Sequence, residues 1–248
     1  MTVRTTIIIQ ARTSSSRLPG KVLQDLCGEP MLQRQIERVR CCRMADQLVI
    51  ATSDEAADDP VAELCAKNQV ACFRGSLNNV LDRFHGAAVA FGPSDHLVRL
   101  TADCPFADPD VIDACIALHL ANGADYTSNK LGTSNRLGPT YPVGLDVEAM
   151  TMEGLGRVHR VASDPYDLEH VTPHFYRNLS QFSLMPLRYL TDLSKLRWTV
   201  DYPADLEFAR AVFSRLLPRN RIFRWQEVLS LVQAAPEIAA INAAHSVS

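Results

Sequence analysis

A short apolar segment that leads into a basic loop constrains this chain more than any other feature. Residues 7–9 are three consecutive isoleucines, and such a run predicts a strand buried on both faces of a parallel sheet. The loop that follows carries three positive charges, on Arg12, Arg17 and Lys21. Backbone N–H groups and basic side chains at the carboxyl end of a core strand are typical of a phosphate-binding site, although a solvated basic turn has the same composition. The position of the charges favours the phosphate site.

Strands and helices alternate through the first half of the sequence. The expected strands are 5–10, 47–52, 70–73 and 96–101, and the expected helices are about 30–41, 57–68, 78–91 and 109–121. Asp108 and Pro109 start the last of these helices with an N-cap residue and the proline preferred at the first helical position. This alternation predicts an α/β fold in which a mostly parallel sheet has helices on both faces.

The second half of the sequence is less regular. A high density of Gly, Pro and Asn between residues 122 and 148 predicts a long loop near a site. Beyond it we expect a helix at about 151–162, strands near 181–188 and at 196–200, helices at about 203–217 and 224–235, and a frayed tail from residue 236. We expect residues 1–248 to form a single domain, which is an ordinary size for one core.

The composition excludes several classes of protein. A net charge of −3 lacks the basic footprint of a general nucleic-acid-binding protein. No apolar run approaches the ~20 residues of a membrane span, and the N-terminal residues do not resemble a signal peptide. The seven cysteines form no CxxC pair and no zinc-binding spacing, so we expect small core residues in a reducing compartment. We therefore expect a cytoplasmic protein that binds neither membrane nor nucleic acid.

Two further strand ends carry acidic residues. Asp103 follows the expected strand 96–101, and Asp201 follows the expected strand 196–200. Mg²⁺ prefers one or two carboxylates together with phosphate oxygens, so the two acids are candidate ligands of one ion and should lie within ~8 Å of each other. Each could instead be only a turn or helix cap. Asp205 is expected to be a first-turn helix residue stabilised by the helix dipole.

Residues 10–21 resemble the N-terminal signature of the cytidylyltransferases that make CMP-sugars, and the spore-coat-polysaccharide type is the nearest branch. The segment is neither a Walker loop nor a GxGxxG dinucleotide motif. The resemblance extends to about residue 217 and includes the two acidic elements. Ala102 is a departure, since most members of that branch have Gly there. The resemblance implies a nucleotide-diphospho-sugar transferase-like fold with a small β-arm in the second half, at about 130–195, for dimerisation or substrate binding.

The resemblance also implies the residues of the site. Those expected to bind the nucleotide are Gln10, Ala11, Arg12, Ser16, Arg17, Lys21, Arg74, Asn78, Arg83 and Asp103. Those expected to be catalytic are Arg12, Arg17, Lys21 and Asp103, and those expected to hold Mg²⁺ are Asp103 and Asp201. Those expected to bind the sugar are Ser128, Asn129, Asp146, Glu148 and His170. Residues 78–83 can also be explained as a capped helix start with a surface ion pair, and residues 169–170 as a structural hydrogen-bonded pair.

The implied reaction is the attack of a sugar hydroxyl on the α-phosphorus of CTP, which releases pyrophosphate and forms a CMP-sugar. The implied partners are CTP, an acidic or amino sugar acceptor and a second copy of the chain in a homodimer. Lys21 and Arg17 are expected to be exposed, so that replacing them leaves the fold intact. The alternatives are a glycosyltransferase, a transferase that uses another nucleotide, a non-catalytic nucleotide-binding module and a component of a larger biosynthetic complex.

Overall fold

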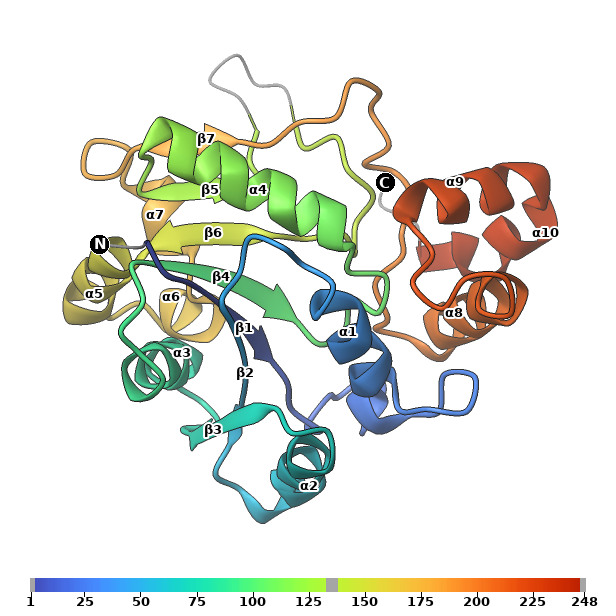
Figure 1. Ribbon diagram of the computed structural model, residues 1–248, viewed down its shortest axis with the longest axis horizontal. Helices are drawn as coiled ribbons and strands as arrows, with labels where there is room; N and C mark the ends of the chain where they lie inside the picture. Colours follow the sequence, from blue (N-terminus) through green and yellow to red (C-terminus); the bar gives the residue numbers. More distant parts are fainter. Residues whose placement is uncertain (1–2, 133–137, 246–248) are drawn as a thin grey trace.

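The computed structural model describes residues 3–132 and 138–245, and within them a seven-stranded sheet forms the centre of the molecule (Figure 1). The strands are β1 (Thr5–Gln10), β2 (Gln47–Ser53), β3 (Ala71–Gly75), β4 (His96–Thr101), β5 (Tyr126–Ser128), β6 (Glu148–Thr151) and β7 (Leu184–Pro186). Their spatial order is β3-β2-β1-β4-β6-β5-β7. Because β6 alone is antiparallel to its neighbours, the sheet is mostly parallel, as the sequence predicted.

Helices connect and cover the strands. The α-helices are α1 (Met31–Val39), α2 (Asp59–Lys67), α3 (Val80–Ala90), α4 (Pro109–Asn122), α5 (Met152–Val161), α6 (Pro165–His170), α7 (Pro173–Arg177), α8 (Pro203–Leu216), α9 (Trp225–Ala234) and α10 (Pro236–Ala239). Three 3₁₀ segments are η1 (Lys21–Leu23), η2 (Ala56–Asp58) and η3 (Ala240–His245). Asp108 caps α4 as predicted, because its side chain accepts a hydrogen bond from the Asp110 N–H. None of the described helices is long and apolar enough to cross a membrane.

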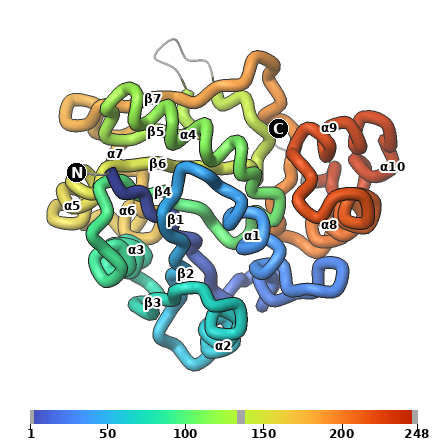
Figure 2. Tube along the Cα trace, viewed as in Figure 1, coloured from blue at the N-terminus to red at the C-terminus, as the bar shows by residue number. Residues whose placement is uncertain are grey.

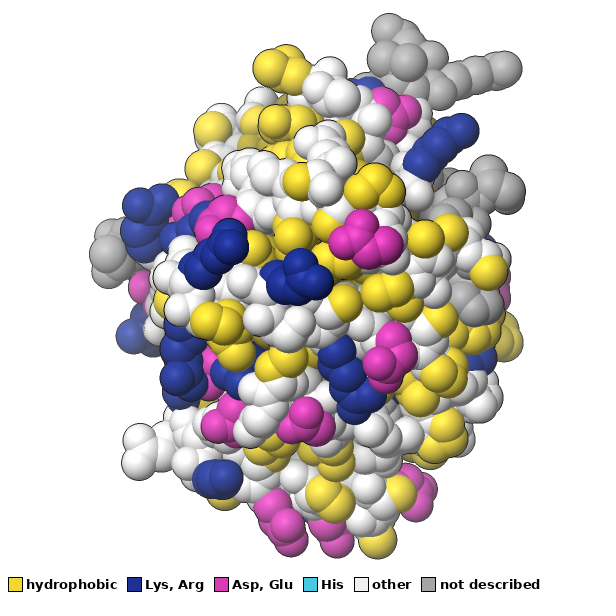
Figure 3. Space-filling view, turned by 90° about the vertical axis from the view of Figure 1, so that its right-hand side faces the viewer, with side chains coloured by type: hydrophobic (Ala, Val, Ile, Leu, Met, Phe, Trp, Pro, Cys, Tyr) yellow, Lys and Arg dark blue, Asp and Glu magenta, His cyan; other side chains and the backbone are white. Residues whose placement is uncertain are grey.

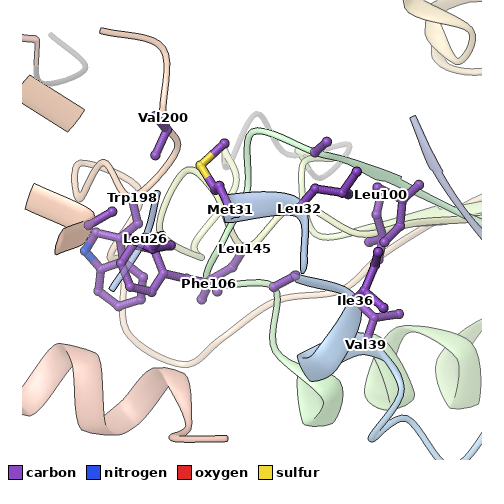
Figure 4. Close-up of a cluster of buried hydrophobic side chains, with 14 of the residues drawn as sticks. Leu26, Met31, Leu32, Ile36, Val39, Leu100, Phe106, Leu145, Trp198 and Val200 are labelled. Carbon is purple, nitrogen blue, oxygen red and sulfur yellow. The ribbon is translucent and has the colours of Figure 1, made fainter. Parts of the chain in front are cut away.

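The three isoleucines of β1 divide between the two faces of the sheet. Ile7 and Ile9 belong to the larger apolar cluster, which includes side chains from α1, α2, α4, α8 and α9. Ile8 belongs to a second cluster with side chains from α3, α5 and α7. Figure 4 shows part of the larger cluster, in which the rings of Phe106 and Trp198 lie 6.1 Å apart. Both faces of β1 are therefore buried, which explains the unbroken apolar run.

The register of the central strands determines where the loops meet. Gln10 pairs with Ala51 of β2 and with Thr101 of β4, so three parallel strands end side by side. The backbone continues this pairing one residue further, because Ala11 N–H donates to Ala51 and Ala102 N–H donates to Gln10. The basic loop after β1 and the acidic segment after β4 consequently leave the sheet together. Ligands of open α/β sheets bind at this edge.

Three features of the second half differ from the prediction. The expected loop 122–148 contains β5, and the expected strand 196–200 is extended backbone with a single bridge between Arg197 and Val143. Residues 236–245 of the expected frayed tail are helical, because Ile238 is buried and Asn242 donates to the Arg197 carbonyl, and residues 246–248 lie outside the described residues. Figure 2 shows the resulting group of α8, α9 and α10 at one side of the molecule. On the face drawn in Figure 3, basic and acidic side chains are interspersed, as the small net charge implies.

Candidate functional site

The basic loop after β1 folds back onto its own backbone. The Thr13 carbonyl accepts hydrogen bonds from the N–H groups of Ser15 and Gly20, each at 2.8 Å. Gly20 has a φ of 67°, which a residue with a side chain adopts only at a cost in energy. The chain then turns into η1, which directs Lys21 toward the edge of the sheet. We call residues 11–20 the phosphate loop.

Lys21 lies between the two acidic residues. Its Nζ donates to Asp103 Oδ2 at 3.2 Å, to Asp201 Oδ1 at 2.9 Å and to the Val200 carbonyl at 2.8 Å. The two carboxylate oxygens are therefore at most roughly 6 Å apart, within the separation expected for a shared ion. The prediction that Lys21 is exposed was wrong, since only 8% of the residue is accessible. Its three acceptors explain why an ammonium can be buried there.

Several cations hold these acids ionised. Burial alone would raise the pKa of Asp201, but hydrogen bonds and charge from Lys21, with further bonds from Arg197 and Arg17, lower it to about 2. Arg197 contacts Asp201 at 2.8 Å and Arg17 contacts it at 2.9 Å. Burial also opposes ionisation of Asp103, but the Lys21 charge and hydrogen bonds from Thr101 and Lys21 together outweigh it, so that the pKa of Asp103 is lowered. Both groups are carboxylates at neutral pH.

The same arrangement suits a divalent cation. The Lys21 ammonium shows that the Asp103 and Asp201 carboxylates and the Val200 carbonyl converge on one positively charged group. All three are oxygen donors, which Mg²⁺ prefers. Among the described residues no group of three or more His, Cys, Asp or Glu side chains could hold a metal ion. A metal held by two acids would take its other ligands from water and a phosphate, as Mg²⁺ commonly does.

A cavity of about 510 Å³ lies between the phosphate loop, β4 and α3. Eight of the ten residues predicted to bind the nucleotide line it, namely Gln10, Ala11, Arg12, Ser16, Arg17, Lys21, Arg83 and Asp103. Arg74 and Asn78 do not. Arg74 instead pairs with Asp59 at 2.7 Å, and Asn78 is exposed. We call this space the nucleotide cavity.

Arg83 is the most deeply buried cation of the nucleotide cavity. Its guanidinium donates to the carbonyls of Ser76 and Leu77, while its Nε has no hydrogen-bond partner within the described structure. Burial lowers the pKa of Arg83 to about 10. The capped helix start is confirmed, because Asn79 accepts from the Asp82 N–H at 2.9 Å. The surface pair between Asp82 and Arg83 is not found.

A second cavity, of about 1010 Å³, adjoins the first. Of the predicted sugar-binding residues, Asp146, Glu148 and His170 line it, while Ser128 and Asn129 do not. Asn129 braces the chain instead, donating to the Leu145 carbonyl and accepting from the Val147 N–H. We call this space the acceptor cavity. The lining residues common to both cavities are Arg99, Thr101, Asp103, His170 and Asp201. The two acids therefore stand where the cavities meet.

Charged residues of the acceptor cavity are paired with one another. Glu148 binds Arg99 and accepts hydrogen bonds from the Tyr126 hydroxyl at 2.6 Å and the Thr172 hydroxyl at 2.7 Å. Burial opposes its ionisation, but the charges of Arg99 and Lys130 and these hydrogen bonds lower the pKa of Glu148 to about 2. Lys130 contacts Asp146 at 3.3 Å, and the Glu148 charge raises the pKa of Lys130.

The residues of the site that were not predicted include Arg99, Lys130, Thr172 and Arg197. A signal existed for Arg99, because an arginine inside the apolar strand 96–101 needs a buried acidic partner. Arg197 stands four residues before Asp201, which is a weaker signal. Lys130 and Thr172 have no local signal. They reach the cavity only because the chain brings the segment after β5 and the start of α7 beside Glu148.

Comparisons with known proteins agree with this arrangement. A family model described as cytidylyltransferase matches residues 6–208. The chain is 35% identical to the spore coat polysaccharide biosynthesis protein SpsF of Bacillus subtilis, across 94% of this chain and 95% of that protein. A solved cytidylyltransferase from Leptospira borgpetersenii superposes with a TM-score of 0.89 and 30% identity, covering 96% and 97% of the two chains. A CMP:2-keto-3-deoxy-manno-octonic acid synthetase complexed with CTP superposes with a TM-score of 0.63 and 20% identity, covering 86% and 99%.

Proposed function

Since this chain belongs to the cytidylyltransferase family and is a nucleotidyltransferase, we propose that it uses CTP to convert a sugar into a CMP-sugar with release of pyrophosphate. The family and the nucleotide-diphospho-sugar transferase-like fold agree with the prediction from the sequence. One observation carries the proposal: a basic nucleotide cavity and a larger acceptor cavity meet at Asp103 and Asp201. That is the arrangement that transfer from a nucleotide to an acceptor requires.

The phosphate loop would hold the leaving group. Arg12, Arg17 and Lys21 line the nucleotide cavity on the side of the loop, where their charges can neutralise the β- and γ-phosphates. Asp103 and Asp201 would hold Mg²⁺, which supplies further neutralisation of charge on the α-phosphate and the pyrophosphate. The acceptor hydroxyl would approach the α-phosphorus from the acceptor cavity. Catalysis would then rest on positioning and on cancelling charge, which phosphoryl chemistry mainly needs.

The proposed acceptor is a sugar for a surface polysaccharide. Two names support this class, since SpsF is named for spore coat polysaccharide and the synthetase solved with CTP is named for a 2-keto-3-deoxy acid. The acceptor cavity contains both cationic and anionic side chains, with Lys130 and Arg99 opposite Asp146 and Glu148. An acidic or an amino sugar can find complementary groups there.

Pyrophosphate release tests the proposal. We expect release with CTP, and not with ATP, GTP or UTP, when Mg²⁺ and one member of a panel of 2-keto-3-deoxy acids, amino sugars and sugar phosphates are present. Release from another nucleotide would point to a different nucleotidyltransferase. Tight binding of CTP without turnover across the panel would favour a non-catalytic module, and transfer from a nucleotide-sugar would favour a glycosyltransferase.

We also propose a cytoplasmic homodimer in which residues 130–195 mediate pairing, although residues 133–137 of this segment lie outside the described residues. Edge strand β7 lies in this segment, and Leu190 projects fully into solvent beside it. An edge strand and an exposed apolar side chain favour association. Light scattering at micromolar concentration should give about twice the 27.5 kDa chain mass, whereas a monomer mass across that range would exclude the dimer.

A further inference from the structure

A buried carboxylate is hydrogen-bonded to the phosphate loop from the side of β2. It is separate from Asp103 and Asp201 and from the acids of the acceptor cavity. Asp58, the last residue of η2, is only 1% exposed. Its Oδ1 accepts hydrogen bonds from both the N–H and the hydroxyl of Thr13, each at 2.7 Å. Its Oδ2 accepts from the N–H and the hydroxyl of Ser53 at the end of β2. One carboxylate thus joins the loop to the sheet.

Thr13 is the residue on which the phosphate loop closes. Its carbonyl accepts the N–H groups of Ser15 and Gly20, while its own N–H and hydroxyl are held by Asp58. The Thr13 hydroxyl also lies 3.0 Å from the Ala57 carbonyl. Thr13 directly follows Arg12, and Gly20 directly precedes Lys21. Fixing Thr13 therefore fixes the backbone at the two ends of the loop that presents the cations.

Asp58 satisfies four donors at once and does so without an ion-pair partner among the described residues. A carboxylate has about four acceptor sites and no donor, so it is the one side chain of this size that fits four N–H and O–H groups. An asparagine would place an N–H against the backbone N–H of Thr13 or Ser53. A buried acid retained at such a place needs a reason beyond packing.

We propose that Asp58 is a positioning residue that holds the phosphate loop in its ligand-binding conformation and thereby determines the affinity for the β- and γ-phosphates. Asp58 touches neither cavity and acts through Thr13. Its effect should therefore depend on how many phosphates the ligand has. The proposal rests on the proposed function, because it assumes that the loop grips a nucleoside triphosphate.

The test compares the dissociation constants of CTP and CMP, measured by calorimetry with Mg²⁺ present. In Asp58→Asn we expect CTP to bind at least ~10-fold more weakly and CMP to bind within about twofold of the wild type, since one lost charge-assisted bond and one unpaired donor cost about that much. The matched control is Asp113→Asn. Asp113 is also buried and accepts the backbone N–H groups of Arg43 and Met44, but it lines neither cavity.

Asp113→Asn should lower thermal stability and leave the ratio of the CTP dissociation constant to the CMP dissociation constant unchanged. If Asp58→Asn does not fold, Thr13→Val decides the matter. This variant removes only the hydroxyl and should raise the ratio of the CTP dissociation constant to the CMP dissociation constant about threefold, and Thr13→Ser should restore the wild-type ratio. An unchanged ratio in Asp58→Asn, or in Thr13→Val where that variant is needed, would overturn the role of Asp58. A wild type that binds no nucleoside triphosphate would instead overturn the proposed function.

Discussion

The phosphate loop and the Arg99–Glu148 pair hold their charges in opposite ways. In the nucleotide cavity the cations of the phosphate loop are partly solvated, since the side chains of Arg12 and Arg17 are 41% and 52% exposed. In the acceptor cavity Arg99 and Glu148 are 9% and 4% exposed and are paired with each other. A solvated cation is available to an incoming anion at little cost to the fold. A buried ion pair stabilises the fold and also shapes the cavity. Breaking it should therefore lower both stability and activity.

The largest effect should come from the boundary between the cavities. Asp103→Asn should reduce turnover about 1000-fold, because it removes one of the two carboxylates proposed to hold Mg²⁺ and leaves the developing charge uncompensated. Steady-state pyrophosphate release measures this effect. Glu207→Gln is the control, since Glu207 is exposed and its one ion pair within the described structure is with Arg210. Turnover of Asp103→Asn within about tenfold of the control would remove Asp103 from the metal site.

Replacing the buried acid of the acceptor cavity should damage both stability and activity. Glu148→Gln leaves Arg99 without its partner, so the free energy of unfolding at pH 7 should fall by about 3 kcal/mol. Urea denaturation measures this change, with Glu153→Gln on the exposed face of α5 as the control. If the two variants were equally stable, the acceptor cavity would not be more tightly coupled to the fold than the nucleotide cavity.

Low pH should reduce the difference in the free energy of unfolding between the wild type and Glu148→Gln. Folding lowers the pKa of Glu148 from its ordinary value of 4.5 to about 2, so its contribution is complete above pH 4.5 and is lost as the pH falls toward 2. Glutamine does not titrate. The stability gap between the wild type and Glu148→Gln should therefore shrink by about 2 kcal/mol between pH 7 and pH 3, as measured by denaturation at several pH values. A constant gap would mean that Glu148 is not ionised in the folded protein.

The smallest effect on the fold should come from the phosphate loop. Arg17→Ala should raise the dissociation constant for CTP about tenfold, the weight of one charge-assisted contact, and change the free energy of unfolding by less than about 0.5 kcal/mol. Calorimetry and urea denaturation measure the two quantities. Arg221→Ala serves as control, because Arg221 is exposed and pairs with Glu37 away from both cavities. Equal CTP affinity in the two variants would contradict the phosphate-loop assignment.

The sequence was most informative where local pattern decides structure. The bounds of β1 and β4 were predicted correctly because apolar runs bounded by polar loops need no knowledge of the partner strand. The grouping of Arg12, Arg17 and Lys21 beside Asp103 followed from parallel strands ending at one edge. Residues 196–200 were also predicted to be a strand, yet within the described residues they join no strand of the sheet and form one isolated bridge, between Arg197 and Val143. Strand pairing is a property of the whole chain.

The differences between the predicted and the observed site also depend on tertiary packing, which local sequence does not determine. The resemblance implied that Arg74 binds the nucleotide, and in the structure Arg74 pairs with Asp59 at the start of α2. Lys21 was expected in solvent because none of its three acceptors is near it in the sequence. The resemblance implied that Ser128 binds the sugar, and in the structure Ser128 belongs to β5 and is buried. In each case tertiary packing determines which groups the side chain contacts.

Lys21 also links the site to the order in which the chain can assemble. Its ammonium is held by residues 82 and 180 positions away. We expect contacts at such separations to form late, because closing so long a loop costs conformational entropy before the contact stabilises the fold. A chain still being synthesised, with residues up to 190 emerged, holds the complete phosphate loop but has no Asp201 to receive Lys21. Lys21 can therefore reach Asp103 and Asp201 together only after the last third of the protein has docked. A site in which Lys21 contacts both acids implies that this docking has occurred.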